Sequence, residues 1–287
     1  MISQLNRVSE IENGLKERLT SQLANVAVVF SGKGGTGKTF FAANFAKRYS
    51  KNHKVLLVDF DQNLANLNLL LNLTSNKTLK SFFDSRDTFN EVITELDDNF
   101  HLILGEAGTF GQDKLSVDQI DRLFNQFILY SDKYDLVVLD IGAGISEENI
   151  YAVSKAGIKI LVTNPEPTAL MDAYVAVKSL KNAFSTELIY VVVNRCIEQG
   201  EGNLAFNNLK SAISHFLKTR IELLTDVDDS TSVRKSIISQ KLLAETDQTN
   251  PVIRSIDMAV KKISKNNQVF NINQLQDGLF HKSFENS

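Results

Sequence analysis

The sequence lacks what several protein classes require. It holds one cysteine, Cys196, and no tryptophan among 287 residues, so neither a disulfide framework nor a four-cysteine iron–sulfur cluster can form within one chain. No stretch approaches the ~18 uninterrupted apolar residues of a membrane-spanning helix. The first 25 residues carry three glutamates and lack the apolar core of a signal peptide. These absences predict a cytoplasmic protein.

An excess of positive charge is also missing. The 34 acidic residues outnumber the 31 lysines and arginines, for a formal net charge of −3. Short basic pairs such as Lys47-Arg48 have no basic run around them, so nucleic acid is an unlikely partner on charge alone. The apolar content of 43% is ordinary and allows one large α/β domain with short terminal additions.

Apolar runs alternate with helical patterns along the chain. We expect strands at 26–30, 54–59, 101–104, 135–139, 158–163, 187–193 and 220–224, and helices that include 39–50, 116–130, 167–183 and 202–217. The near-continuous hydrophobicity of the strands is typical of strands that are buried on both faces. This order predicts an α/β fold: a doubly wound, mostly parallel sheet flanked by helices, with ligands at the carboxyl ends of the strands.

Residues 32–39 read GKGGTGKT and lie between the first predicted strand and the first predicted helix. This is the spacing and context of a phosphate-binding P-loop, in which glycines let successive backbone N–H groups point at one anion. Lys38 would reach the β- and γ-phosphates of a nucleotide, and the Thr39 hydroxyl would bind Mg²⁺. The loop therefore predicts binding of a nucleoside triphosphate with Mg²⁺.

The same loop also fits the Gly-x-Gly-x-x-Gly pattern of dinucleotide-binding oxidoreductases. Gly32, Gly34 and Gly37 match that pattern, and Asp59 lies about where a ribose-binding acid is expected. Lys38-Thr39 argues against this alternative, because a phosphate-binding cation and a metal-binding hydroxyl have no use in that site.

Acidic residues end two further predicted strands. Asp59 and Asp61 close the second strand, and Asp140 follows the apolar run at 136–139, with Gly142 just beyond it. At the carboxyl edge of a parallel sheet these acids would face the metal and the terminal phosphate. We expect Asp59 and Asp140 to organise the Mg²⁺ shell and Asp61 to position the attacking water.

A second lysine, Lys33, lies at the second position of the loop. In this respect the loop resembles the deviant Walker A motif of the MinD/ParA ATPases, a subclass of the SIMIBI P-loop proteins. The resemblance implies that ATP drives formation of a homodimer in which Lys33 reaches the nucleotide of the other subunit. It makes Lys33, Lys38 and Asp61 the expected catalytic residues and matches the acid needed for hydrolysis to Asp61.

The resemblance also implies the remaining nucleotide contacts. An asparagine at the end of a late strand reads the adenine base in this family, and Asn194 matches it, although a buried asparagine that caps a turn is the alternative. The expected nucleotide-binding residues are Gly34, Gly35, Thr36, Gly37, Lys38, Thr39, Phe40, Asn194 and Arg195. The chain departs from the family pattern at Asn63, at Asn68 and near Thr225, where the family has a glycine, an aspartate and a proline.

Within the family, the segments at 140–146, 165–168 and 172–174 are most similar to the FlhG (FleN) branch of flagellar-number ATPases. That similarity implies a switch that acts on an FlhF-like GTPase or on flagellar switch proteins. The alternatives are a MinD-like division-site ATPase, a DNA-partitioning ParA, which the acidic balance disfavours, and a scaffold that binds nucleotide without turnover.

The two ends of the chain lie outside the predicted ATPase domain, which we place at 25–264. Residues 1–24 would form a helical extension, with Ile2, Leu5, Val8, Leu15 and Leu19 on a thin stripe that Glu12 interrupts. Residues 265–287 would form an amphipathic tail. The MinD and FlhG resemblance implies that such a tail binds the inner face of the membrane peripherally, while a helix docked on its own domain is the alternative.

Overall fold

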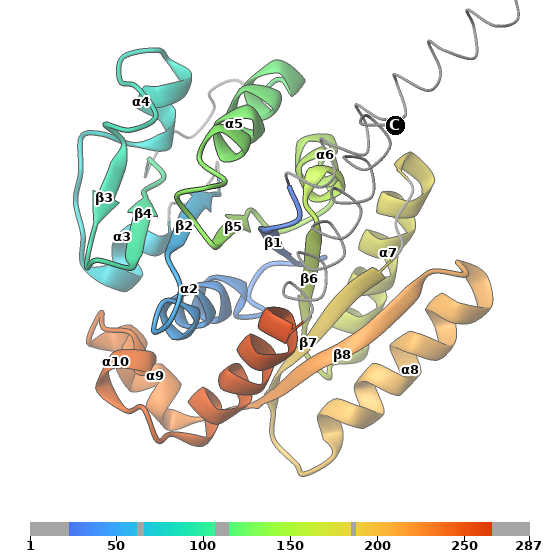
Figure 1. The fold of residues 1–287 in the computed structure, drawn as a ribbon. Coiled ribbons are helices and arrows are strands. Elements are labelled where there is room, and N and C mark those ends of the chain that lie inside the picture. The colour runs from blue at the N-terminus through green and yellow to red at the C-terminus, as the bar shows by residue number, and fades with distance from the viewer. Residues whose placement is uncertain (1–22, 62–65, 107–114, 185–187, 266–287) are drawn as a thin grey trace, which may run out of the picture.

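The computed structural model describes residues 23–61, 66–106, 115–184 and 188–265. Eight strands form one sheet in the order β3-β4-β2-β5-β1-β6-β7-β8 (Figure 1). The strands are β1 (Val26–Phe30), β2 (Val55–Phe60), β3 (Ile93–Glu95), β4 (Phe100–Ile103), β5 (Leu136–Ile141), β6 (Ile158–Thr163), β7 (Leu188–Cys196) and β8 (Arg220–Asp228). All pairs are parallel except β3 with β4. The predicted fold class is confirmed.

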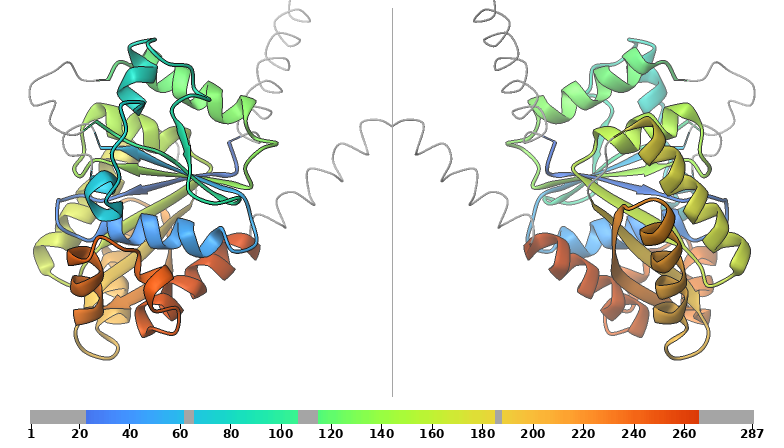
Figure 2. Two further views of the ribbon diagram at one scale, coloured as in Figure 1. Left: turned by 90° about the vertical axis from the view of Figure 1, so that its left-hand side faces the viewer. Right: turned by 90° about the vertical axis from the view of Figure 1, so that its right-hand side faces the viewer.

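Two layers of helices cover the sheet, because each buried strand presents alternate side chains to opposite faces. The helices are α2 (Lys38–Tyr49), α3 (Asn66–Leu71), α4 (Leu79–Phe83), α5 (Val117–Leu129), α6 (Glu147–Lys155), α7 (Pro167–Ala183), α8 (Glu201–Phe216), α9 (Thr231–Ile238) and α10 (Leu243–Thr246), followed by a helix at 251–265. One core cluster joins β1 to α5, α6, α7 and α8. The other joins β1 to α2, α10 and helix 251–265, and Figure 2 shows the two layers edge-on.

The order of the strands places the carboxyl end of β1 at the switch point of the sheet. From β1 the chain passes to β2 on one side, and β6 later pairs with β1 on the other side. In open α/β sheets, ligands bind at the carboxyl edge where the strand order reverses. The loop at 31–37 leaves β1 at this point.

One strand was not predicted from the sequence. β3 has three residues, pairs antiparallel with β4 and lies at the edge of the sheet. Its residues are half-buried or exposed, so it lacks the continuous apolar run that identifies the interior strands. β7 and β8 also extend to Cys196 and Asp228, beyond the predicted ends at 193 and 224.

A buried histidine–tyrosine pair joins His101 on β4 to Tyr134, which lies just before β5. His101 is 1% exposed, and its Nδ1 lies 2.8 Å from the Tyr134 hydroxyl. Burial lowers the pKa of His101, and the nearby Glu95 carboxylate opposes this only in part. Folding therefore favours the neutral imidazole.

This pair predicts a pH dependence of stability. A histidine whose pKa is depressed on folding stabilises the folded state above its unfolded pKa, near 6.5, and loses that contribution as pH falls. We expect the free energy of unfolding of the wild type to decrease from pH 7.5 to 5.5 more steeply than that of His101→Asn, which keeps an amide near the Tyr134 hydroxyl. Urea unfolding at several pH values checks this. Equal slopes for the two proteins would contradict it, and His215→Asn serves as a surface control.

Candidate nucleotide-binding site

The loop at 31–37 has the backbone that its glycines permit. Gly35 and Gly37 have φ values of +80° and +89°, a region that other residues rarely adopt. Gly37 is the N-cap of α2, and no side chain caps the start of that helix. Since the first N–H groups of a helix lack partners within the helix, the start of α2 is suited to bind an anion.

Two neighbouring segments hold this loop in place. A Cβ atom on Gly32 would lie 2.2 Å from the backbone oxygen of Asp172, so the loop packs directly on the first turns of α7. On the other side, Asn194 Nδ2 donates a hydrogen bond to the Thr36 backbone oxygen over 2.7 Å. Asn194 is buried and fixes the loop from β7. Its reading of the adenine base stays a prediction.

Beneath the loop lies a buried ion pair. Lys38 Nζ lies 2.7 Å from Asp140 Oδ1, and the two side chains are 7% and 0% exposed. The other oxygen of Asp140, Oδ2, is buried without a hydrogen-bond partner in the described part of the chain, as is the Thr36 hydroxyl. The predicted P-loop lysine and strand-end acid therefore form an ion pair. One oxygen of Asp140 and the Thr36 hydroxyl remain available to bind a further group.

Asp59 lies beside Asp140, because β2 and β5 pair these residues in register. Its carboxylate accepts hydrogen bonds from the backbone N–H groups of Asp61 and Leu67, each over 3.1 Å. Burial, with the Asp140 charge next, raises the pKa of Asp59 to about 7. Two buried acids against a single lysine form a site in which a further cation would relieve the repulsion between them.

These residues fit a Mg²⁺ ion that takes only some of its ligands from the protein. In the described ranges, no three His, Cys, Asp or Glu side chains gather as a complete metal site. Mg²⁺ is usually held by one or two carboxylates together with phosphate oxygens and waters. Asp59, Asp140 and Thr39, the second residue of α2, are the side chains that would hold it, and this assignment stays a prediction.

Asp61 lies at the same edge, opposite the glycine that follows β5. A Cβ atom on Gly142 would lie 3.2 Å from Asp61 Oδ1, and Asn66 Nδ2 lies 3.5 Å from Asp61 Oδ2. The expected water-positioning acid is thus brought next to Gly142, just beyond the end of β5. Asn63 lies outside the described residues.

Lys33 makes a contact that the sequence did not predict. Its Nζ lies 3.0 Å from Glu166 Oε2 and 3.1 Å from Thr168 Oγ1, at the start of α7. Lys33 is 30% exposed and Glu166 62% exposed. Within one chain, Lys33 is therefore held in a partly exposed ion pair with Glu166, which lies 133 positions away in the sequence.

The remaining expected contacts are less direct. The Phe40 side chain is buried in the core beside α2, so any contact of Phe40 with a nucleotide would come from its backbone. Arg195 is exposed, with a φ of +62°, and its role stays a prediction. Asn68 donates to the Gly105 backbone oxygen over 3.2 Å. Leu224–Asp226, where a proline was expected, lie inside β8, where Thr225 and Asp226 pair with β7 and Leu224 lies at a shift in the register.

Of the two predicted terminal segments, 1–24 and 265–287, residues 1–22 and 266–287 lie outside the described residues, and so does the apolar stretch 268–284 of the predicted tail. Within the described ranges, no helix is long and apolar enough to cross a membrane.

Comparison with known proteins finds relatives that match most of the chain. The chain is 29% identical to the antiactivator FleN of Pseudomonas aeruginosa, over 80% of this chain and 83% of that protein. It is 26% identical to the flagellum site-determining protein YlxH of Helicobacter pylori, over 80% and 78%. The septum site-determining protein MinD of Pyrococcus horikoshii, solved with Mg-ADP, matches the fold with a TM-score of 0.72 at 22% identity, over 86% of this chain and 98% of that one.

The family model of the CobQ/CobB/MinD/ParA nucleotide binding domain matches residues 27–243. This range contains the loop at 31–37, both buried acids and Asn194. The chain belongs to the CobQ/CobB/MinD/ParA family of nucleotide-binding proteins.

Proposed function

We propose that the protein is a switch ATPase that binds ATP with Mg²⁺, forms a homodimer and hydrolyses the nucleotide slowly. The observation that carries this proposal is the buried Lys38–Asp140 pair under a glycine loop, with Asp59 and Asp61 alongside. A dinucleotide-binding oxidoreductase would have no use for a lysine at this position.

The geometry suggests how the residues would act. ATP would draw Lys38 from Asp140 to the β- and γ-phosphates, and the start of α2 would bind the same oxygens. Bound Mg²⁺ would neutralise charge on the phosphates. Asp61 would hold the attacking water opposite Gly142. Lys33 would leave Glu166 and reach the nucleotide of the partner subunit.

The Lys33–Glu166 pair gives a prediction for dimer formation. In Glu166→Gln, Lys33 loses its charged partner within the chain, so less free energy is needed to release it. Exposed ion pairs contribute only about 0.2–1 kcal/mol, so we expect the ATP concentration at half-maximal dimer formation to fall about two- to fivefold. Light scattering during an ATP titration measures this. Glu198→Gln, at another exposed glutamate, is the control, and an unchanged or raised midpoint in Glu166→Gln would contradict the prediction.

For the cellular role, we propose regulation of flagellar number or placement. The similarity to FleN and YlxH across about four-fifths of the chain supports it. A MinD-like role at the division site is the second candidate, supported by 33% identity to MinD of Synechocystis over 59% of this chain. The partner would be an FlhF-like GTPase or flagellar switch protein, and the segment 268–284 would bring the dimer to the membrane surface.

Deletion of the gene in its native cell tests the role. We expect altered flagellar number or position under the electron microscope, restored by the wild-type gene but not by a Lys38→Met allele. Normal flagella together with misplaced septa would instead support the division-site role.

A further inference from the structure

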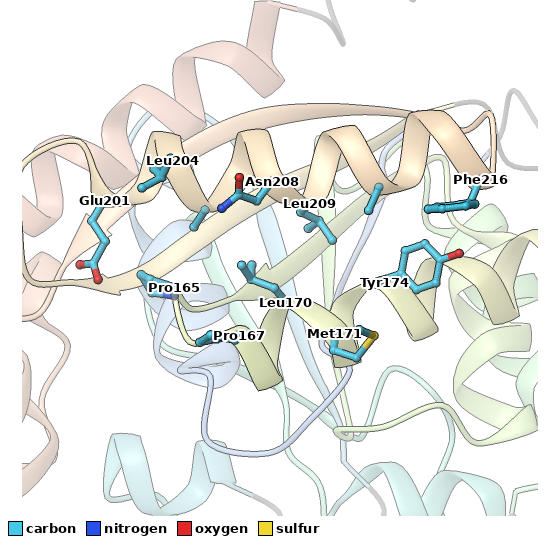
Figure 3. A pocket seen from close by; sticks show the side chains of 12 residues that line it. Pro165, Pro167, Leu170, Met171, Tyr174, Glu201, Leu204, Asn208, Leu209 and Phe216 are labelled. Carbon is cyan, nitrogen blue, oxygen red and sulfur yellow. The ribbon is translucent and has the colours of Figure 1, made fainter.

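An apolar groove runs between α7 and α8, away from the P-loop acids. It encloses about 600 Å³. Leu170, Met171 and Tyr174 line it from α7, and Leu204, Leu209 and Phe216 line it from α8 (Figure 3). Met171, Leu204 and Phe216 are 61%, 64% and 70% exposed. A row of large exposed apolar side chains along two helices indicates a binding surface for another segment.

The position of Leu23, the first described residue, helps to identify the segment that occupies the groove. Leu23 belongs to the same core cluster as α7 and α8, and its backbone oxygen accepts a hydrogen bond from Gly157 N at the amino end of β6. Phe216 ends α8 just before β8 begins, so it marks the end of the groove at the same amino edge of the sheet. Leu23, the first described residue, thus lies on the face and at the edge where the groove opens.

The other terminal segment starts from the opposite face. Helix 251–265 packs with α2 through residues such as Ile253, Ile256 and Ile263, in the second core cluster. Residues 266–287 would have to pass around the sheet to reach the groove. The position of the two chain ends therefore favours the N-terminal segment.

The length and sequence of that segment match the groove. A helix over 2–19 would span about 26 Å, against about 24 Å for α8. With Leu19 placed beside Phe216, Leu15 falls level with Ala212 and Val8 level with Ala205. The polar Glu12, which interrupts the apolar stripe, then falls level with Leu209, one residue beyond Asn208, and both residues line the groove.

A pair of opposite charges, Arg7 in the segment and Glu201 on α8, also agrees with this register. Arg7 falls level with Leu204, about one helical turn from Glu201, and Glu201 lines the groove at its Pro165 end. A basic side chain would thus face an acidic one where the groove approaches the carboxyl edge of the sheet. The apolar stripe and the charge match in one placement, with Glu12 offset by one residue from the polar Asn208.

We propose that residues 2–19 dock in the α7–α8 groove of their own chain as an amphipathic helix parallel to α8. The docked segment covers the exposed apolar side chains of the groove. It also lies beside Pro165 and Pro167, the residues on either side of Glu166, which holds Lys33. This inference does not depend on nucleotide hydrolysis.

Disulfide trapping in the full chain tests the placement. Cys196 is 3% exposed and can stay, with each single-cysteine variant as its control. We expect the pair Leu15→Cys with Ala212→Cys to form an intramolecular disulfide at least about tenfold faster than Leu15→Cys with Leu129→Cys, because docking raises the local concentration of the two thiols. Leu129 is an exposed leucine on α5.

Three results would overturn the proposal. Equal rates for the two pairs would show that the segment does not dock in the groove. Disulfides that form only between chains would assign the groove to a second copy. Faster trapping of Leu275→Cys with Ala212→Cys would assign it to the C-terminal segment.

Two methionines that are exposed in the described ranges give a second measurement without cysteine substitutions. Met171 lies in the groove, and Met258 lies on helix 251–265, where it is 54% exposed. We expect peroxide to oxidise Met171 several-fold more slowly than Met258 in the wild type, and at a similar rate in Leu15→Asp/Leu19→Asp. Fast oxidation of Met171 in the wild type, unchanged by these substitutions, would contradict docking.

Discussion

Lys38→Met is expected to abolish tight binding of ATP. The substitution keeps the length of the side chain but removes the cation that would contact the β- and γ-phosphates. Charge-assisted hydrogen bonds to buried phosphates are among the strong polar contacts, so we expect affinity to fall at least about a hundredfold, given that ~1.4 kcal/mol is a tenfold change. Fluorescent ATP titration measures it, and unchanged affinity would refute the P-loop assignment.

This variant also changes the stability of the nucleotide-free protein. Asp140 is fully buried and would lose its partner, and breaking a buried ion pair on one side costs about 3–5 kcal/mol. Lys38→Met/Asp140→Asn is therefore the matched control, because it removes the charge of Asp140 together with that of Lys38. We expect the double variant to recover much of the free energy of unfolding and still fail to bind ATP, which separates loss of the site from loss of the fold.

Asp61→Ala is expected to bind ATP normally and to hydrolyse it at least about a hundredfold more slowly, the lower range for loss of one positioned acid or base. Asp61 lies opposite Gly142 at the carboxyl edge, whereas the Lys38–Asp140 pair is untouched. Phosphate release measures turnover, and Asp118→Ala on α5 is the control. Turnover at the wild-type rate would remove Asp61 from the proposed mechanism.

The sequence predicted the centre of the fold well because that centre depends on local patterns. Apolar runs identified seven of the strands, and a glycine loop between a strand and a helix defined the phosphate-binding segment. Parallel strands bring their carboxyl ends to one edge, and this places the start of α2 beside the end of β5. The ion pair found there, with Lys38 Nζ 2.7 Å from Asp140 Oδ1, was not itself predicted.

The contacts that were missed depend on long-range packing. The Lys33–Glu166 and Asn194–Thr36 bonds join residues 133 and 158 positions apart, and no local pattern encodes either. β3 was missed because three half-buried or exposed residues show no usable periodicity. The α7–α8 groove arises from the spacing of two helices, each of which looks like an ordinary amphipathic helix when taken alone.

In the proposed switch, Lys33 completes the ATP site of a partner subunit. The most direct test compares Asp61→Ala with Lys33→Ala/Asp61→Ala by light scattering in ATP and Mg²⁺, with hydrolysis suppressed in both. We predict that Asp61→Ala has the mass of two chains in ATP and of one chain in ADP, and that the double variant binds ATP but stays a single chain. An ATP-bound dimer of the double variant, or a monomeric Asp61→Ala that is saturated with ATP, would contradict the account.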